Sequence, residues 1–487
     1  MCKKLRLIPL SILLLALASC ARPTPIPVYV TPTPAGPTPM PTAIPEIAQP
    51  TPTATETVTG VTPPTETPTE ALTPTATPTP FEGTFGPVVP PAFTPPPTET
   101  PRPTRTPTPG TPTITLTPSI SPTPSITPTP LPGLDPLRIG IQIHPRIEQS
   151  LWERMLQRAE QLNVGWIKVQ FQWDEMEPDG PGSQSDYWRQ MELYMQTALR
   201  YGFQVLVSVT KAPDWARPTN EENGPPSDPQ ELARFITSFL DRFGPAIHAI
   251  EVWNEPNLIR EWRGAPMNGA TYMRYFDAAY RAINTWNQQN DQGHRIRVIT
   301  AGLAPTGNSQ WSVDDRLFLR QMYQAGLARY TDVGVGAHPY AWGNAPDARC
   351  CNPVPNRNWD DDPHFFFLDT IEAYRQIMVN FGHASAQLWI TEFGWATYDG
   401  FGVPAPQPFF DYVDEMSQAH YTIKALDIIQ NSGNYDYVGP MILWNLNFAV
   451  LPEAVSVHRE EQAGYSLLRP DQTERPLYWI LWDALNN

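Results

Sequence analysis

Short apolar runs alternate with amphipathic stretches through residues 134–487. Eight β-rich runs predict strands, and apolar residues at helical spacing predict helices between them, for example over Glu148–Leu162, Gln190–Tyr201 and Pro229–Phe243. Because parallel strands need such crossovers, this order predicts an α/β fold, a (β/α)8 TIM barrel. A doubly wound open sheet is the alternative, but no Gly-rich phosphate loop follows the first run. The predicted strands are Leu137–His144, Gly165–Trp173, Gln204–Thr210, Ile247–Asn254, Ile296–Gly302, Val333–His338, Gln387–Glu392 and Gly439–Asn445.

Residues 1–20 have the pattern of a secretory signal. Lys3, Lys4 and Arg6 precede a mostly apolar run from residue 7 to 18 that is short for a membrane-spanning helix. The closing Leu-Ala-Ser-Cys resembles a bacterial lipobox, so we expect lipidation of Cys20; an ordinary signal peptide with an incidental cysteine is the alternative. The protein is therefore predicted to be an exported lipoprotein at the cell surface, with the barrel outside the cytoplasm.

Residues 21–133 are rich in proline and threonine. This stretch holds 34 of the 60 prolines and none of the 16 tryptophans. Such a segment cannot bury enough apolar surface to offset the entropy lost on ordering, so it predicts a disordered linker. The expected organisation is a signal peptide (1–20), a linker (21–133) and a folded barrel (134–487).

The net charge of −16 falls on residues 134–487, which carry 27 basic and 43 acidic side chains. An acidic domain without a basic stripe argues against nucleic acid and anionic membrane surfaces as partners. No His-Glu-x-x-His motif or Gly-x-Ser-x-Gly motif is present. The run Asp360-Asp361-Asp362 is compatible with calcium, but a solvated charge run is favoured. No metal or cofactor is therefore expected.

Two predicted strand ends carry carboxylates. Asn254-Glu255-Pro256 closes the fourth strand, and Thr391-Glu392-Phe393-Gly394 closes the seventh. A barrel brings the C-terminal ends of its strands to one face. Cleavage of a glycosidic bond needs one carboxyl to protonate the leaving oxygen and another at the anomeric carbon. The two motifs therefore predict a catalytic pair, although either Glu alone is compatible with a satisfied buried acid.

On these motifs, residues 137–480 resemble the retaining (β/α)8 glycoside hydrolases of clan A, especially families 39 and 5. The resemblance implies that Glu255 is the acid/base and that Glu392 is the nucleophile of a glycosyl-enzyme intermediate. It also implies that Asn254 binds the sugar 2-hydroxyl and that the carboxyls lie about 5–5.5 Å apart.

Other strand ends extend the resemblance. His338 and Tyr340 match a His-x-Tyr segment whose tyrosine touches the nucleophile, and Trp444 matches the aromatic floor under the reacting sugar. Trp215 lies in a Pro-x-Trp-Ala element typical of family 39. Lys168 departs from the pattern, because an arginine commonly supports the nucleophile there, and lysine lacks the bidentate fork.

Further residues are candidates from their positions alone. His144, at the end of the first strand, is a plausible glycan donor or else a structural histidine. Tryptophans after strand ends are expected near the barrel mouth, whereas those in helical patterns are expected in the core. The mouth candidates are Trp215, Trp262, Trp342 and Trp395, and the core candidates are Trp152, Trp286 and Trp479.

Cys350 and Cys351 are the only cysteines after Cys20. In an exported protein two adjacent thiols favour a vicinal disulfide, and two free thiols are the alternative.

The sequence thus predicts a retaining glycosidase that cleaves O-glycosidic bonds, β-linked by the resemblance, in a polysaccharide or oligosaccharide. A non-catalytic carbohydrate-binding lipoprotein with the same barrel is the alternative, and transglycosylation by the same intermediate is a third possibility. The expected partners are the carbohydrate and, through the lipid anchor only, a membrane; a monomer is expected.

Overall fold

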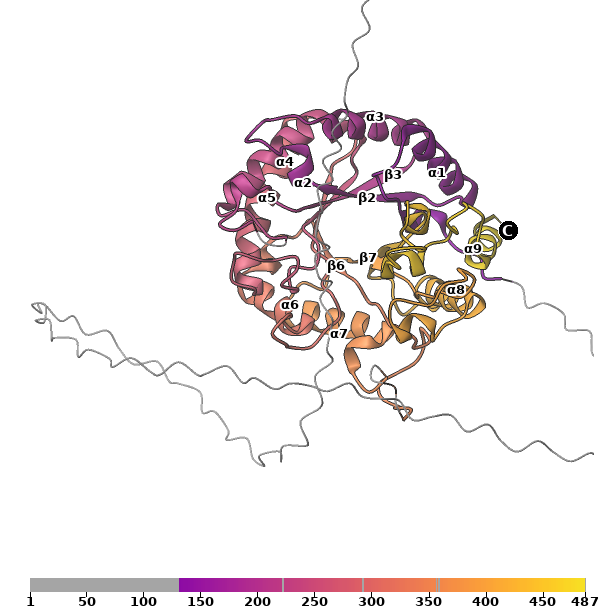
Figure 1. Ribbon diagram of the computed structural model, residues 1–487. Helices are drawn as coiled ribbons and strands as arrows, with labels where there is room; N and C mark the ends of the chain where they lie inside the picture. Colours follow the sequence, from indigo (N-terminus) through magenta and orange to yellow (C-terminus); the bar gives the residue numbers. More distant parts are fainter. Residues whose placement is uncertain (1–130, 221–222, 291–292, 356, 358–359, 487) are drawn as a thin grey trace, which may run out of the picture. The chain divides into compact units, whose positions relative to one another are not determined.

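The computed structural model describes residues 131–486 except 221–222, 291–292, 356 and 358–359. In this part of the chain, eight parallel strands close into a barrel in sequence order, with helices around it (Figure 1). The predicted (β/α)8 barrel is confirmed. The strands are β1 (Ile139–Gln142), β2 (Trp166–Gln172), β3 (Gln204–Thr210), β4 (Ala249–Val252), β5 (Arg297–Thr300), β6 (Val333–Ala337), β7 (Leu388–Phe393) and β8 (Val438–Leu443).

All eight predicted strands are present, but most are shorter than their apolar runs. The fourth was expected to reach Asn254 and ends at Val252. The next residue, Trp253, has φ of 76°, which takes the backbone out of the extended region. The apolar run therefore continues past the point where the ladder stops.

The helices cover the outside of the barrel, and several of them begin at polar caps. Ser185, Asp228, Asn268, Asp314 and Asp414 each accept a hydrogen bond from a backbone N–H in the first turn of the following helix. The helices are α1 (Gln149–Leu162), α2 (Trp173–Met176), α3 (Asp186–Arg200), α4 (Pro229–Phe243), α5 (Gly269–Gln289), α6 (Asp315–Gln324), α7 (Phe367–Asn380), α8 (Glu415–Asn431) and α9 (Pro476–Asn486).

Side chains alternate along the strands, so the barrel interior is layered. The layer nearer the N-terminal ends of the strands is apolar and is formed by Trp166, Leu206, Ala249, Ile299, Trp389 and Ile442. Two residues further along the same strands, toward their C-terminal ends, the buried side chains include Lys168, Ser208, Glu251 and Thr391. The interior therefore turns from apolar to polar toward the end where the candidate carboxylates lie.

The predicted signal peptide, Cys20 and the linker up to residue 130 lie outside the described residues. Within the described residues, no helix combines the length and apolar character needed to cross a bilayer.

Candidate active site

Glu255 follows β4 and Glu392 lies in β7, and the barrel brings their side chains together. One carboxylate oxygen of each, with a ring nitrogen of His338, falls within a group whose atoms all lie within 4.8 Å of one another. Their side chains are 10% and 6% exposed, so both carboxyls are nearly buried yet retain an accessible edge. The two carboxyls are therefore close enough to act on the same bond of a ligand.

Both oxygens of Glu392 have partners that orient the carboxylate. Lys168 Nζ donates to Oε1 at 2.8 Å, and the Tyr340 hydroxyl donates to Oε2 at 3.0 Å. Lys168 comes from β2 and Tyr340 from the segment after β6. Lys168 thus stands where an arginine was expected from the resemblance, and it contacts Glu392 through one donor atom, Nζ.

Glu251 is a buried carboxylate that sequence reasoning did not single out. Its side chain is fully buried, and it lies 2.8 Å from Lys168 Nζ. It also accepts from Gly302 N, from the Ser208 hydroxyl and from the Thr391 hydroxyl. Its position in β4, two residues after inward-facing Ala249, is the pattern that would have revealed it.

Lys168 therefore forms ion pairs with two carboxylates, Glu251 and Glu392. Burial alone would lower the pKa of Lys168, but Glu251 and Glu392 outweigh this effect and raise it. Burial likewise opposes ionisation of Glu251, yet Lys168 and His338 hold its pKa well below the usual range. Lys168 is thus a cation held between two carboxylates.

His338 links the two halves of the site. Its Nδ1 lies 3.1 Å from Glu255 Oε1, and its Nε2 lies 3.1 Å from the Thr391 hydroxyl. Since Thr391 donates its own proton to Glu251, it accepts from His338, so Nε2 carries a hydrogen. The raised pKa of His338 and the lowered pKa of Glu255 place the proton of the contact between them on Nδ1.

Gly302 makes room for this ring. A Cβ atom at Gly302 would lie 2.2 Å from ring atoms of His338. The Gly302 carbonyl accepts from Glu255 N at 3.0 Å, and its N–H donates to Glu251. Because Gly302, two residues after β5, has no side chain, the ring of His338 can lie close to Glu255.

The His338–Glu255 pair should set the alkaline limit of activity. Burial lowers the pKa of His338, but Glu392, Glu251 and Glu255 raise it to about 9. The pair therefore keeps its proton at neutral pH, and we expect kcat/KM to fall as pH rises toward about 9. The same shift stabilises the fold fully below pH about 6.5, and this contribution is lost as pH rises through about 9.

A pH–rate profile of His338→Ala checks this prediction. Its alkaline limb should move to lower pH, because Glu255 alone must then hold the proton. His420→Ala, an exposed histidine on α8, is the control and should leave the limb in place. An unmoved limb in His338→Ala would contradict the assignment.

The backbone at the end of β4 is strained. Trp253 and Glu255 have φ values of 76° and 43°, in the left-handed region that few non-glycine residues adopt. The Trp253 indole donates to the Glu261 carbonyl at 2.9 Å, which helps to hold the turn. Such strain, held by its surroundings, is typical of functional positions.

Arg260 and Glu261 are further charged residues that the sequence analysis missed. Arg260 Nη2 donates to Glu255 Oε2 at 3.2 Å. Burial raises the pKa of Glu255, but hydrogen bonds from His338 and Arg260 outweigh it and leave that pKa lowered. Burial raises the pKa of Glu261 to about 8, with Glu255 and Glu392 adding to the rise and Arg260 opposing it.

Aromatic rings cluster beside Glu392. Trp444 lies 5.9 Å from Tyr340 and 5.1 Å from Tyr465, and the two tyrosines are 5.5 Å apart. Trp444 thus lies beside the tyrosine that contacts Glu392. Tyr465, from the segment after β8, was not expected.

Among the buried side-chain atoms without a hydrogen-bond partner, three lie at or just after the ends of β1, β4 and β8. They are Gln142 Oε1 at the end of β1, Asn254 Oδ1 after β4 and Trp444 Nε1 after β8. Buried polar atoms are rarely left unpaired in native proteins. Two acceptors and one donor at the C-terminal ends of the strands are suited to hydroxyl groups of a ligand.

His144 also lies at this end of the barrel. Burial, with a smaller effect of Arg146, lowers its pKa to about 4, so the ring is neutral at pH 7. Its Nδ1 accepts from Arg146 N, which places the ring hydrogen on Nε2. His144 can therefore donate a hydrogen bond, and Phe448 lies 4.7 Å from its ring.

Trp215 is held by structural contacts. It lies in η2 (Asp214–Ala216), and its indole donates to the Glu177 carbonyl at 2.8 Å. The Arg234 guanidinium lies 5.6 Å from its ring centre, and Trp173 packs edge to face at 5.9 Å. These contacts account for its half-buried position.

Comparison with known proteins gives structural likeness only. No family model matches the chain, and no curated protein matches it. A family 39 glycoside hydrolase from Bacteroides cellulosilyticus WH2 matches with a TM-score of 0.52 and 16% identity, over 73% of this chain and 65% of that chain. This chain thus covers slightly less than two thirds of the length of that enzyme.

The barrel fold is shared with a family 39 glycoside hydrolase. Two further matches have lower TM-scores. A glucosidase from Croceicoccus marinus has a TM-score of 0.49 and 12% identity over 73% of this chain and 68% of its own. A GH5-4 endoglucanase from Clostridium longisporum has a TM-score of 0.47 and 14% identity, over 72% of this chain and 96% of that chain. The predicted resemblance to a clan A barrel is confirmed as a resemblance of fold.

Several tryptophans lie elsewhere than expected. Trp262 and Trp395, expected at the mouth, are 1% and 2% exposed, because both pack into the core against other aromatic rings. Trp479, expected in the core, is 53% exposed on α9. Trp311, which the sequence analysis did not select, is 52% exposed between β5 and α6, and its carbonyl accepts from Ile259 N.

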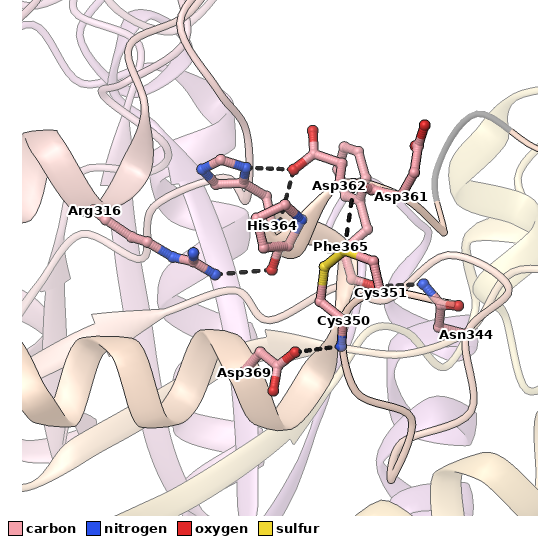
Figure 2. The surroundings of a disulfide bond; sticks show 10 residues. Arg316, Asn344, Cys350, Cys351, Asp361, Asp362, His364, Phe365 and Asp369 are labelled. Carbon is pink, nitrogen blue, oxygen red and sulfur yellow. Dashed lines mark hydrogen bonds and ion pairs between the residues drawn. A yellow bond between two sulfur atoms is a disulfide. The ribbon is translucent and has the colours of Figure 1, made fainter. Parts of the chain in front are cut away.

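The segment between β6 and α7 contains a disulfide between Cys350 and Cys351 (Figure 2). Asp369, on α7, accepts from Cys350 N at 2.8 Å and so holds this segment to the helix. Asp360, expected in a solvated run, is only 3% exposed and accepts from Val354 N. The acidic run is therefore partly structural.

Proposed function

We propose that the protein is a retaining glycoside hydrolase acting on β-linked oligosaccharides or polysaccharides. The observation that carries the proposal is the approach of Glu255 and Glu392 to within 4.8 Å at the C-terminal end of the barrel. This limit applies to one oxygen of each carboxyl, and so close an approach favours a retaining pair, with carboxyls about 5–5.5 Å apart, over an inverting pair, with carboxyls about 6.5–9.5 Å apart.

In the first step, Glu392 attacks the anomeric carbon while Glu255 protonates the leaving oxygen. Lys168 and Tyr340 hold Glu392 in place, and His338 Nδ1, 3.1 Å from Glu255, can pass to it the proton that the acid needs. In the second step, Glu255 takes a proton from water, which attacks the glycosyl-enzyme and releases the sugar.

Substrate binding would use the unpaired polar atoms and the aromatic rings. Asn254 Oδ1 is free to accept from a sugar hydroxyl, and Trp444 Nε1 is free to donate. The faces of Trp444 and Tyr465 offer stacking surface for the C–H face of a sugar ring. These groups support a carbohydrate rather than an anionic ligand.

A carbohydrate-binding protein without turnover is the competing prediction. The departure at Lys168 does not by itself favour it, because the ion pair between Lys168 and Glu392 at 2.8 Å gives the proposed nucleophile a cationic partner. Transfer of the sugar to an acceptor other than water uses the same intermediate, and lengthened products would reveal it.

The test measures sugar release by the full chain from a panel of β-glycans and follows the anomer formed first by NMR. Retention of the β configuration is expected, and release of the α anomer would refute the retaining mechanism. Binding without release from any glycan would favour the non-catalytic alternative.

Glu255→Gln tests the acid specifically. It should lower kcat on natural glycans by about 10²- to 10⁴-fold. An aryl glycoside whose phenol leaves without protonation should lose far less in the bond-breaking step. Equal losses on both substrates would contradict the role of Glu255 as the acid.

We also propose that the barrel is exported and anchored through lipidated Cys20, on the strength of the N-terminal pattern. Mass spectrometry of the mature N-terminus tests this, and an unmodified Cys20 would refute it.

A further inference from the structure

A second cluster of potential ligands lies outside the site described above. Asp314 and Asp315 stand at the start of α6, and His364 lies in η5 (Pro363–Phe365) between β6 and α7. His364 Nε2 is 3.0 Å from Asp314 Oδ2 and 3.4 Å from Asp315 Oδ1. One ligand atom of each residue lies within 4.8 Å of the others.

Asp315 contributes a buried oxygen that lacks a hydrogen bond. Its side chain is fully buried, and its Oδ2 accepts from the Tyr374 hydroxyl at 2.8 Å. Its Oδ1 has no hydrogen-bond partner and faces His364. Leaving a buried carboxylate oxygen unpaired is costly, so this atom points to a missing partner.

His364 and Asp314 are oriented so that a ligand contacting Asp315 could also contact them. His364 Nδ1 lies 2.5 Å from Asp362 Oδ1 and donates to it, because a carboxylate oxygen only accepts. Figure 2 marks this contact. Loss of the proton from Nε2 would then leave its lone pair for a cation. A carboxylate behind a histidine in this way is typical of metal sites. Asp314 uses Oδ1 to cap α6 through Leu317 N, and its Oδ2 hydrogen-bonds His364 Nε2 at 3.0 Å, a contact that a cation bound to both atoms would replace.

We propose that Asp314, Asp315 and His364 bind a divalent cation of the zinc class, with water completing the coordination. Ligand atoms around such an ion, at about 2.0–2.2 Å, lie roughly 3.3 Å from one another. The distances of 3.0 and 3.4 Å in the cluster agree with this value. Calcium fits less well, because it takes about 6–8 oxygen ligands at longer distances.

Charge balance supports the assignment. A His364 that binds a cation through Nε2 is neutral, and the carboxylates of Asp314, Asp315 and Asp362 then face one guanidinium among the groups named here, that of Arg316, whose Nη2 donates to the Pro363 carbonyl at 2.8 Å. The neighbourhood then has two excess negative charges, which a divalent cation neutralises.

The ion would cross-link the segments that follow β5 and β6. Val313, next to Asp314, donates to the Asn257 carbonyl at 2.9 Å, and Asn257 lies two residues after Glu255. The segment after β6 also carries the Cys350–Cys351 disulfide. The expected role is to stabilise the chain around the catalytic acid, with no part in the bond-breaking step.

The test uses the full chain stripped of metal by a chelator, with Zn²⁺ or Co²⁺ added alone. We expect one Zn²⁺ per chain by calorimetry, a higher melting temperature with Zn²⁺, and visible Co²⁺ absorption typical of nitrogen and oxygen ligands. His364→Gln should weaken Zn²⁺ binding by about 100-fold or more.

Asp315→Asn is the second variant, since it preserves the volume of the side chain and should also lose the Co²⁺ absorption. His458→Gln, a 56% exposed histidine, is the matched control and should bind Zn²⁺ like the unmodified chain. Absence of stoichiometric binding, or binding unchanged in both cluster variants, would overturn the proposal and leave a metal-free cluster of His364 with its acids.

Discussion

Glu392→Ala is expected to abolish hydrolysis while leaving glycan binding nearly intact. Without the carboxylate no glycosyl-enzyme can form, and we expect kcat to fall on the order of 10⁴- to 10⁶-fold. In contrast to Glu255→Gln, the loss should be equally deep on natural glycans and aryl glycosides, because both need the nucleophile. Steady-state kinetics on both substrates, with calorimetric binding of an oligosaccharide, measure the effect.

Small anions provide an internal control for this variant. Azide can enter the space left by the carboxylate and attack the anomeric carbon itself, and the glycosyl azide formed should have inverted configuration. Wild-type rates in Glu392→Ala would refute the mechanism. A glycosyl azide of retained configuration would reassign Glu392 to the acid/base role.

Lys168→Met is expected to be the most destabilising single change in the barrel interior. Lys168 is fully buried between Glu251 and Glu392, so its loss leaves two buried carboxylates without their cation. Breaking a buried pair in this way costs about 3–5 kcal/mol in the free energy of unfolding. Chemical denaturation at neutral pH measures this loss.

The pH dependence of Lys168→Met separates an electrostatic from a packing effect. Since Lys168 lowers the pKa of Glu251, its removal should raise that pKa, so part of the lost stability should return as pH falls. Lys424→Met is the control, because Lys424 is 49% exposed beside Asp347 and should cost at most about 1 kcal/mol. A loss in Lys168→Met that does not change with pH would contradict the electrostatic account.

The repeated strand and helix pattern was sufficient to predict the barrel, because period-two and helical spacing are local properties. The two Glu motifs were also identifiable, since each stands where an apolar run ends. Their meeting follows from closure of the barrel, which places the ends of β4 and β7 on one face.

Local pattern was a poorer guide to exposure. Trp262 and Trp395 follow strands, as expected of residues at the barrel mouth, yet both are buried in aromatic clusters. Trp479 has the spacing of a helix residue but is exposed on α9. Whether an indole is buried depends on neighbours that are distant in sequence, which spacing does not specify.

The sequence by itself determined the barrel, the order of its elements and the positions of the two candidate Glu motifs, because these depend on local periodicity and on chemical type. Only the tertiary structure decided how the acids are held: Glu251 pairs with Lys168 across the barrel, His338 approaches Glu255 over Gly302, and Asp315 meets His364 from another segment. These contacts join residues from different strands and segments, and their distances and burial exist only after the barrel has closed.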